Sequence, residues 1–327
     1  MRENGFSPPK QKGRVCVTLA LQHVSKSFGS KTVYDNLNLE IPAGTLHGII
    51  GPNGTGKTTF FRLVLGLLPP DSGQITWRGT ALSRNTVRLA YVPEERGLYP
   101  HMSVRQQLRW FGRLAGLNSR ESLKRADLWM ETLALEPYAD TAASDLSKGN
   151  ARKVQLAVGL LGDPELLILD EPFDGMDPVN IRLIQSVLNR LHDYGVTICA
   201  SSHSLDFLDQ FCESFTMLYQ GTAALHGPLA ALREALPWRR LTVRFQTPDA
   251  EARLASWVQH YPDVTREAGR DPHRATYRVP VTLADRLPLR DIWELGSVMT
   301  LSLDAPTLTD VYWNVFGTDS TQTTEVS

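Results

Sequence analysis

The sequence predicts an α/β fold with a mixed sheet at its core, followed by a small α+β unit. Residues 47–65 carry an apolar strand, a glycine-rich turn and an apolar helix in direct succession. A second apolar run, 166–169, is followed directly by two carboxylates. This pattern is typical of a buried parallel strand, because ligands bind at the carboxyl ends of such strands. Strand and helix patterns then restart after residue 239, which indicates the separate α+β unit.

Composition excludes several classes of protein. A chain of 327 residues that is 42% hydrophobic has room for one large or two modest domains. Because 34 Lys and Arg balance 35 Asp and Glu, no bulk positive field favours a nucleic-acid partner. The three cysteines form no C-x-x-C pair, which fits a reducing cytoplasm rather than a disulfide or zinc framework. No apolar run reaches the ~20 residues of a membrane span.

The first part of the chain predicts a tail and then strands. Residues 1–16 carry charges and paired prolines without the apolar core of a signal peptide, so we expect a disordered tail. Residues 17–41 alternate apolar and polar side chains and break at 28–31, which predicts antiparallel strands around a turn. Phe28 stands at that turn. Its ring fits either stacking on an adenine or packing in the sheet's own core.

Residues 51–59 match the phosphate-binding pattern G-x-x-x-x-G-K-T between a strand and a helix. The glycines allow backbone N–H groups to point at one anion, and the helix N-terminus adds partial positive charge. Lys57 supplies a charge for the β- and γ-phosphates, and Thr58 supplies an oxygen for Mg²⁺. The candidate nucleotide-binding residues are Gly51, Pro52, Asn53, Gly54, Thr55, Gly56, Lys57, Thr58 and Thr59.

The middle of the chain predicts another strand and a helical insert. Residues 89–92 form an apolar run before the polar loop 93–97. Two amphipathic stripes follow within 100–146, and we expect two helices that carry no chemistry. Ser147 is a natural N-cap for a helix that extends to about residue 161.

Three candidate side chains come at the ends of two buried strands. Asp170 and Glu171 follow the run 166–169, so Asp170 is placed to hold Mg²⁺ and Glu171 to polarise an attacking water. After a helix at 178–191, the strand 196–201 leads to His203, which we expect on the same rim. A histidine there can donate a hydrogen bond to a γ-phosphate, although a lone histidine after a strand is more often structural.

Residues 17–236 resemble the ATP-binding subunit of an ABC transporter. Residues 51–59 look like its Walker A motif, 146–150 like its signature, and 166–171 like Walker B with a catalytic glutamate. Asp177 matches the D-loop aspartate and His203 the switch histidine. The resemblance implies a P-loop NTPase of the ABC ATPase type, with an antiparallel β subdomain and a helical subdomain at about 100–146. It also implies that ATP and Mg²⁺ are the cofactors and that Phe28 stacks on the adenine. Glu171, His203 and Lys57 are then the catalytic candidates.

The same resemblance implies an assembly and a place in the cell. Two copies would form a head-to-tail dimer in which Ser147 and Gly149 act on the partner's γ-phosphate. The dimer would lie on the cytoplasmic face of the membrane, energise a separate permease for export, and not contact the transported substrate. Asp177 is assigned to the nucleotide site by resemblance.

Three residues depart from the family pattern. Lys148 and Asn150 replace a glycine and the glutamine of the signature, while the serine and second glycine are kept. Glu94 stands where the family carries a glutamine that touches the metal, so we assign Glu94, with Thr58 and Asp170, to the metal site.

Two other functions compete with an energising subunit. A soluble ABC-type ATPase acting on ribosomes or DNA usually has two cassettes or long coiled coils, and this chain shows neither pattern. A nucleotide-switched binding module with little turnover fits poorly, because Lys57, Asp170, Glu171 and His203 are all present.

Residues 239–316 predict an accessory domain with the order βαββαβ, which suggests a ferredoxin-like unit. We expect strands at 241–246, 263–268, 274–279 and 297–303, and helices at 250–260, 283–289 and 307–316. A short helix and linker at 228–238 would precede it, and 317–327 would form a disordered tail. Resemblance relates the unit to an accessory domain of some bacterial export-type cassettes.

Overall fold

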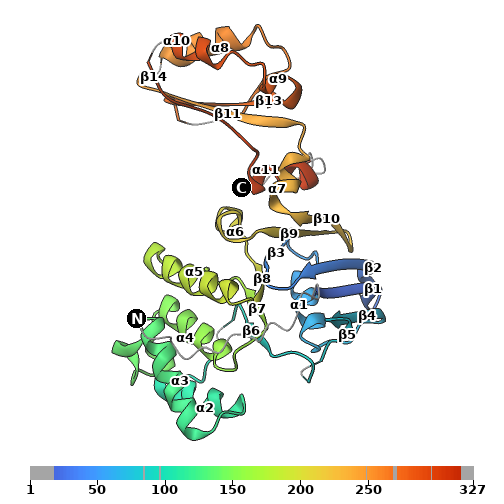
Figure 1. Ribbon diagram of the computed structural model, residues 1–327, viewed down its shortest axis with the longest axis vertical. Helices are drawn as coiled ribbons and strands as arrows, with labels where there is room; N and C mark the ends of the chain where they lie inside the picture. Colours follow the sequence, from blue (N-terminus) through green and yellow to red (C-terminus); the bar gives the residue numbers. More distant parts are fainter. Residues whose placement is uncertain are drawn as a thin grey trace. The chain divides into compact units, whose positions relative to one another are not determined.

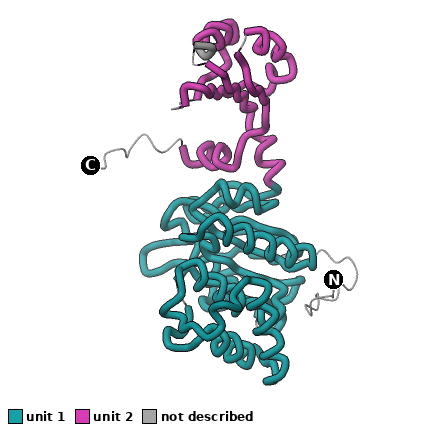
Figure 2. Tube along the Cα trace, turned by 90° about the vertical axis from the view of Figure 1, so that its left-hand side faces the viewer, with its two compact units in different colours: residues 1–228 teal, residues 229–327 magenta. Residues whose placement is uncertain are grey.

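The computed structural model describes residues 18–317, apart from 84, 96, 248, 268–270 and 296. The tail predicted at 1–16, and the tail predicted at 317–327 beyond Gly317, lie outside the described residues. The chain forms two compact units, residues 1–228 and 229–327 (Figure 2). In the described part of the chain, no helix combines the length and the apolar character needed to cross a membrane.

An antiparallel sheet opens the first unit, with the strand order β2-β1-β4-β5. The turn between the first two strands contains Gly29, whose φ of +59° is a left-handed conformation that glycine adopts without a steric penalty. Antiparallel strands with a break at 28–31 were predicted and are confirmed. The strands are β1 (Thr18–Phe28), β2 (Lys31–Pro42), β4 (Ser72–Trp77) and β5 (Thr80–Ala81).

A six-stranded mixed sheet follows, with the order β10-β9-β3-β8-β7-β6. The pairs from β9 to β6 are parallel, and β10 joins β9 antiparallel. The apolar runs are explained by burial, because β3, β7 and β8 are buried at every residue. The strands are β3 (Leu46–Ile50), β6 (Leu89–Val92), β7 (Leu166–Asp170), β8 (Thr197–Ser201), β9 (Ser214–Tyr219) and β10 (Thr222–Pro228).

Helix α1 (Lys57–Val64) lies between the two sheets (Figure 1). Its apolar residues Phe60 and Phe61 are fully buried in a core shared with side chains of β1, β2, β3 and β7. This packing holds the N-terminus of α1 against the end of β3, so the loop between them is placed by the core of the unit.

The helical insert contains the two predicted helices, α2 (Val104–Leu114) and α3 (Ser119–Thr132). Each begins with a reciprocal capping box, formed around Ser103 and Asn118. Helix α2 also contacts α4. The remaining helices of the unit are η1 (Glu136–Tyr138), η2 (Ala143–Asp145), α4 (Lys148–Leu160), α5 (Pro178–Asp193) and α6 (Leu205–Phe211).

The second unit has the predicted βαββαβ order, and its sheet order β12-β13-β11-β14 is antiparallel throughout. It begins before the predicted boundary at 239, because α7 (Leu229–Glu234) contacts α11 (Leu308–Phe316). The other elements are β11 (Trp238–Phe245), α8 (Asp249–Val258), β12 (Thr265–Arg266), β13 (Arg274–Pro280), α9 (Val281–Ala284), α10 (Leu289–Glu294) and β14 (Val298–Asp304).

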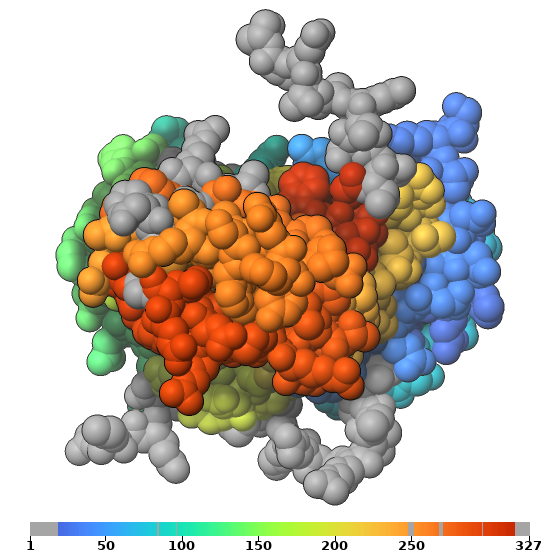
Figure 3. Space-filling model, turned by 90° about the horizontal axis from the view of Figure 1, so that it is seen from above, coloured from blue at the N-terminus to red at the C-terminus, as the bar shows by residue number. Residues whose placement is uncertain are grey.

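One helix of this unit was predicted wrongly. The single helix expected at 283–289 is two short helices, α9 and α10, which Pro288 separates. Proline disfavours helical conformation in the residue before it and has no N–H to donate, so the helix cannot continue through this point. Helices α8, α9 and α10 all contribute to one apolar core with β11 and β13, and their residues fall in the orange to orange-red range of Figure 3.

His47 of β3 is a fully buried titratable group of the first unit. Its ring nitrogens are hydrogen-bonded to Ser214 Oγ (2.7 Å) and Thr216 Oγ1 (2.8 Å). Burial, with a smaller effect of the nearby His226, lowers the pKa of His47 to about 3. In the unfolded chain a histidine pKa is about 6.5. The unfolded state therefore binds more protons between these two pKa values, and the free energy of unfolding falls as the pH falls through this window.

We expect His47→Gln to reduce this acid sensitivity. A single such histidine contributes at most ~1.4 kcal/mol per pH unit, which is lost when the titrating ring is removed. Urea unfolding at pH 7 and pH 5 gives, for each protein, the difference in unfolding free energy between the two pH values. A loss of stability in the variant that is the same at both pH values does not affect this difference. An equal loss in both proteins would show that His47 titrates normally in the folded state.

Candidate functional site

One cleft of the first unit is lined by residues from distant parts of the sequence. The glycine-rich loop and α1 provide one wall, and the ends of β6, β7 and β8 provide the other. Phe28 lines the cleft and is 49% exposed, so it is not packed in the core. The lining residues are Phe28, Lys31, Val33, Asn53, Gly54, Gly56, Lys57, Thr58, Thr59, Glu94, Asp170, Glu171 and His203.

The loop after β3 needs glycine where it enters α1. Gly56 is the N-cap of α1 and has a φ of +106°, a conformation that other residues rarely adopt. A Cβ there would lie 2.7 Å from Tyr34 Oη, and that hydroxyl donates a 2.7 Å hydrogen bond to the Gly56 carbonyl. Since glycine has no side chain to cap the helix, the positive end of α1 faces the loop and suits an anion.

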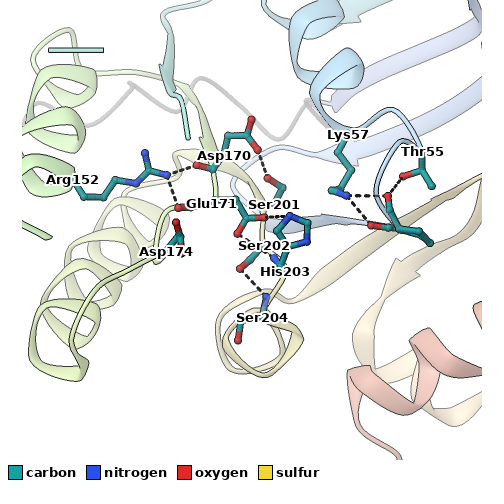
Figure 4. Close-up of polar contacts among 12 residues, drawn as sticks. Thr55, Lys57, Arg152, Asp170, Glu171, Asp174, Ser201, Ser202, His203 and Ser204 are labelled. Atoms are coloured by element: carbon teal, nitrogen blue, oxygen red, sulfur yellow. Dashed lines mark hydrogen bonds and ion pairs between the residues drawn. The ribbon is translucent and has the colours of Figure 1, made fainter. Parts of the chain in front are cut away.

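Lys57 is the cation of this loop. Its Nζ donates to the carbonyl oxygens of Gly51 (2.7 Å) and Pro52 (3.1 Å), as Figure 4 shows. Burial lowers the pKa of Lys57, while the negative charges of Glu171, Asp170 and Glu94 act in the opposite direction. The ammonium group is therefore held against its own loop and can exchange these two carbonyls for a stronger anionic acceptor.

Asp170 is placed by the buried strand β7. Its carboxylate accepts a hydrogen bond from Ser201 Oγ (2.6 Å) at the end of β8 and from Tyr91 Oη (3.3 Å) at β6. Thr58 and Glu94 line the same cleft. A hydroxyl and two carboxylates are the hard oxygen donors that Mg²⁺ prefers, so this set fits that cation.

Glu171 and His203 are in direct contact. The backbone N–H of His203 donates to Glu171 Oε2 (3.1 Å), and His203 Nε2 lies 3.5 Å from Glu171 Oε1. The Glu171 side chain is only 6% exposed, whereas that of His203 is 62% exposed. Burial raises the pKa of Glu171, against the opposing effect of the hydrogen bond from His203. A buried carboxylate with a raised pKa is a stronger proton acceptor, as a general base requires.

Six predicted site residues do not line this cleft: Gly51, Pro52 and Thr55 belong to the loop that forms one wall, and Ser147, Gly149 and Asp177 lie outside that loop. Ser147 is the N-cap of α4, and its Oγ accepts from the N–H of Asn150 (3.3 Å). Gly149 lies in the first turn of the same helix. Asp177 is the N-cap of α5, where hydrogen bonds from Asn180 lower its pKa. Ser147, Gly149 and Asp177 stay predictions for a site that a second copy would complete.

The sequence reasoning missed three residues that the structure brings to this region. Lys31 and Val33 line the cleft, and their only sequence signal is that they follow Phe28 across the turn. Arg152 of α4 is buried, and its guanidinium donates to the carbonyl oxygens of Asp170 and Glu171 (Figure 4). Helix α4 is largely buried, and arginine is rarely buried without a specific partner. The helical pattern of the sequence did not show that Arg152 would be buried.

The chain matches known proteins over part of its length. The family model "ABC transporter" matches residues 34–174. The uncharacterized ABC transporter ATP-binding protein YhaQ of Bacillus subtilis is 40% identical over 226 residues, which are 69% of this chain and 76% of that protein. The Nod factor export ATP-binding protein I of Sinorhizobium fredii is 39% identical, over 66% of this chain and 64% of that protein. The linearmycin resistance ATP-binding protein LnrL of Bacillus subtilis is 31% identical, over 62% and 67%.

Solved structures agree with these relatives. A structure titled as the ATP binding subunit of an ABC transporter superposes with a TM-score of 0.60 at 29% identity, over 66% of this chain and 92% of that one. The ADP conformation of MJ1267, an ATP-binding cassette of an ABC transporter, gives a TM-score of 0.57 at 22% identity, over 65% and 92%, which supports the fold alone.

Proposed function

This chain belongs to the family of ABC transporter ATP-binding proteins, and from that membership we propose that it energises a separate membrane-spanning permease. The family binds and hydrolyses ATP. The observation that carries the proposal for this chain is the cleft that gathers the glycine-rich loop, Lys57, Asp170, Glu171 and His203.

In this proposal the adenine stacks on Phe28 and the triphosphate lies along residues 51–59. The backbone N–H groups of the loop and the N-terminus of α1 stabilise the phosphate charge. Lys57 leaves the carbonyls of Gly51 and Pro52 for the β- and γ-phosphates, where a charge-assisted hydrogen bond is stronger. Thr58, Asp170 and Glu94 would hold Mg²⁺, and the cation would neutralise charge on the phosphate oxygens.

Hydrolysis then requires an oriented water. The Glu171 carboxylate accepts a proton from that water while the water's oxygen bonds to the γ-phosphorus, and the bond to the β–γ bridging oxygen breaks to leave ADP and phosphate. His203 donates a hydrogen bond to the γ-phosphate, and its contact with Glu171 keeps the two groups together. Such catalysis consists mostly of positioning and electrostatic stabilisation.

A second copy completes the proposed site. Ser147 and Gly149 stand at the N-terminus of α4, outside the cleft of their own chain, which supports a role toward a partner's γ-phosphate in a head-to-tail dimer. A Cβ added at Gly149 would be in ordinary van der Waals contact with Asn180 Nδ2 (3.6 Å), and Gly149 is buried within its own chain. Asp177 caps the neighbouring helix α5 and is assigned to the same interface.

We assign the transport direction as export and the location as the cytoplasmic face of the membrane. Two of the matched relatives are named for Nod factor export and for linearmycin resistance. The second unit is proposed as an accessory domain, and the transported substrate is recognised by the permease rather than by this chain.

Purification of the native chain under mild detergent conditions tests this proposal. We expect an integral membrane subunit to copurify with it, and nucleotide to affect the complex. Ribosomes or DNA in place of a membrane protein would instead support a soluble ATPase of the same family and would overturn the transport role.

We expect Glu94 to make ATP binding depend steeply on Mg²⁺, and Glu94→Gln to flatten this dependence. The Glu94 carboxylate attracts a divalent cation, but without the cation its charge lies in the same cleft as Glu171 and the γ-phosphate. We therefore expect a steep Mg²⁺ dependence of ATP affinity in the wild type and a flatter one in the variant, with hydrolysis retained.

ATP titrations over a series of free Mg²⁺ concentrations measure this difference. Glu95→Gln is the matched control, because Glu95 is the adjacent exposed carboxylate and does not line the cleft. Superimposable curves for wild type and Glu94→Gln would show that the Glu94 side chain does not reach the metal.

A further inference from the structure

We propose that Arg152 is a positioning residue for ATP hydrolysis, which fixes the ends of β6 and β7 so that Glu94, Asp170 and Glu171 face one cleft. This role rests on the proposed function and adds a residue that does not itself line the cleft. Its hydrogen bonds to these residues go to main-chain carbonyls and not to the side chains of the three acidic residues.

The guanidinium of Arg152 bridges two strand ends. One of its terminal nitrogens, Nη2, donates to the carbonyls of both Asp170 and Glu171. The other, Nη1, donates to the carbonyl of Pro93 and lies 3.3 Å from that of Glu94. These carbonyls lie at or just after the ends of β7 and β6, which are neighbouring parallel strands. The planar fork of arginine donates in two fixed directions and therefore sets the distance between the two segments.

The neighbouring side chain of Gln155 extends this contact. Its Nε2 donates to the carbonyl of Glu95 (2.7 Å), and its Oε1 lies 3.4 Å from Arg152 Nη1. Arg152 and Gln155 are three residues apart and so share one face of α4. The loop after β6 is thus held at Pro93, Glu94 and Glu95 by one turn of a helix.

The charge of Arg152 is costly to bury, which argues for a specific use. The residue is 5% exposed, and burial lowers its pKa, whereas the surrounding carboxylates Asp170, Asp174 and Glu171 act against that change. Within the described part of the chain, its guanidinium donates to carbonyl and amide oxygens rather than to a carboxylate. A neutral or apolar residue would be cheaper here if the position served packing alone.

The backbone that Arg152 holds is strained. Glu171 has a φ of +50°, a left-handed conformation that is unfavourable for a residue with a side chain. Its N–H donates to the Ser201 carbonyl (3.1 Å) and its carbonyl accepts from Arg152, so both sides of the strained residue are fixed. Strain of this kind persists only where the surroundings determine the conformation.

Arg152 also connects the N-terminal end of α4 with the ends of β6 and β7. Helix α4 begins after Ser147, its N-cap, and reaches Arg152 in its second turn. A movement of the N-terminus of α4 would therefore be transmitted directly to the backbone of Asp170 and Glu171, one helical turn away.

Arg152→Gln in the full-length protein tests the role, with Arg125→Gln as the matched control. Arg125 is a partly buried arginine of α3 that donates to the Leu161 carbonyl (2.9 Å) and pairs with Asp163 (2.5 Å), away from the cleft. For each folded protein, the ATP dissociation constant and kcat are measured separately. We expect Arg152→Gln to change the dissociation constant by less than about 3-fold but to lower kcat by roughly 100-fold, as misplaced catalytic groups do.

Arg125 contacts the C-terminal end of α4 at Leu161 and not the turn that carries Arg152. We therefore expect Arg125→Gln to lower the melting temperature without changing kcat. Arg152→Lys keeps the charge but not the planar fork, so its kcat should stay far below that of the wild type. If Arg152→Gln does not fold, Arg152→Lys provides the same comparison.

The outcomes separate this inference from the function it rests on. A wild-type kcat in folded Arg152→Gln, or an equal loss of kcat in Arg125→Gln, would overturn the positioning role and leave the ATPase assignment intact. A wild-type protein that neither binds nor hydrolyses ATP would overturn the proposed function itself.

Discussion

Glu171→Gln is expected to lower the rate of phosphate release by orders of magnitude while ATP binding stays within a few-fold of the wild type. The substitution keeps the size of the side chain but removes the carboxylate that accepts a proton from water. General-base catalysis contributes about 10² to 10⁴-fold, so the rate should fall by that order. Most of the proposed phosphate contacts come from residues 51–59, on the opposite wall of the cleft, and the substitution does not alter that wall.

The measurement compares phosphate release and ATP affinity in the two purified proteins. Glu165→Gln is the control, because Glu165 lies just before β7 at its other end, where it pairs with Arg78 (2.9 Å). That variant should hydrolyse ATP at the wild-type rate. Phosphate release by Glu171→Gln at a rate near that of the wild type would remove Glu171 from the mechanism.

Lys57→Ala is expected to weaken ATP binding itself. Loss of a hydrogen bond to a charged partner costs about 1.5–3 kcal/mol, which corresponds to an increase in the dissociation constant of roughly 10- to 150-fold. The burial of Lys57 beside the loop places it at the upper end of this range.

Equilibrium titration with a fluorescent ATP analogue measures this change. Lys124→Ala removes the same charge from the exposed surface of α3 and should bind the analogue as the wild type does. If Lys57→Ala retained wild-type affinity, the triphosphate would have to bind without this side chain, and the site would have to be reassigned.

The fold was predictable where local sequence and burial agree. The segment 47–65 combines an apolar strand, glycines and an apolar helix, and it forms β3, the loop and α1 as expected. Helices α2 and α3 were equally predictable, since each shows an amphipathic stripe of apolar residues at helical spacing. The single helix at 283–289 was predicted wrongly, because the short apolar pattern indicated one helix although Pro288 separates α9 from α10.

The candidate site was predictable only in part. Strand order places the ends of β7 and β8 side by side, so Asp170, Glu171 and His203 were expected together, and they line one cleft. Arg152 was not predicted, because its contacts are with main-chain carbonyls of residues that are distant in sequence. The roles of Ser147, Gly149 and Asp177 stay predictions, since they depend on a second chain.

The central claim is that ATP binds in the cleft between residues 51–59 and the ends of β7 and β8. The most direct measurement is a structure of Glu171→Gln determined with ATP and Mg²⁺. We expect the triphosphate along residues 51–59, the adenine on Phe28, and Lys57 Nζ moved away from the Gly51 and Pro52 carbonyls that it contacts here. A triphosphate bound elsewhere, or Lys57 still on those carbonyls with ATP in the cleft, would contradict the account.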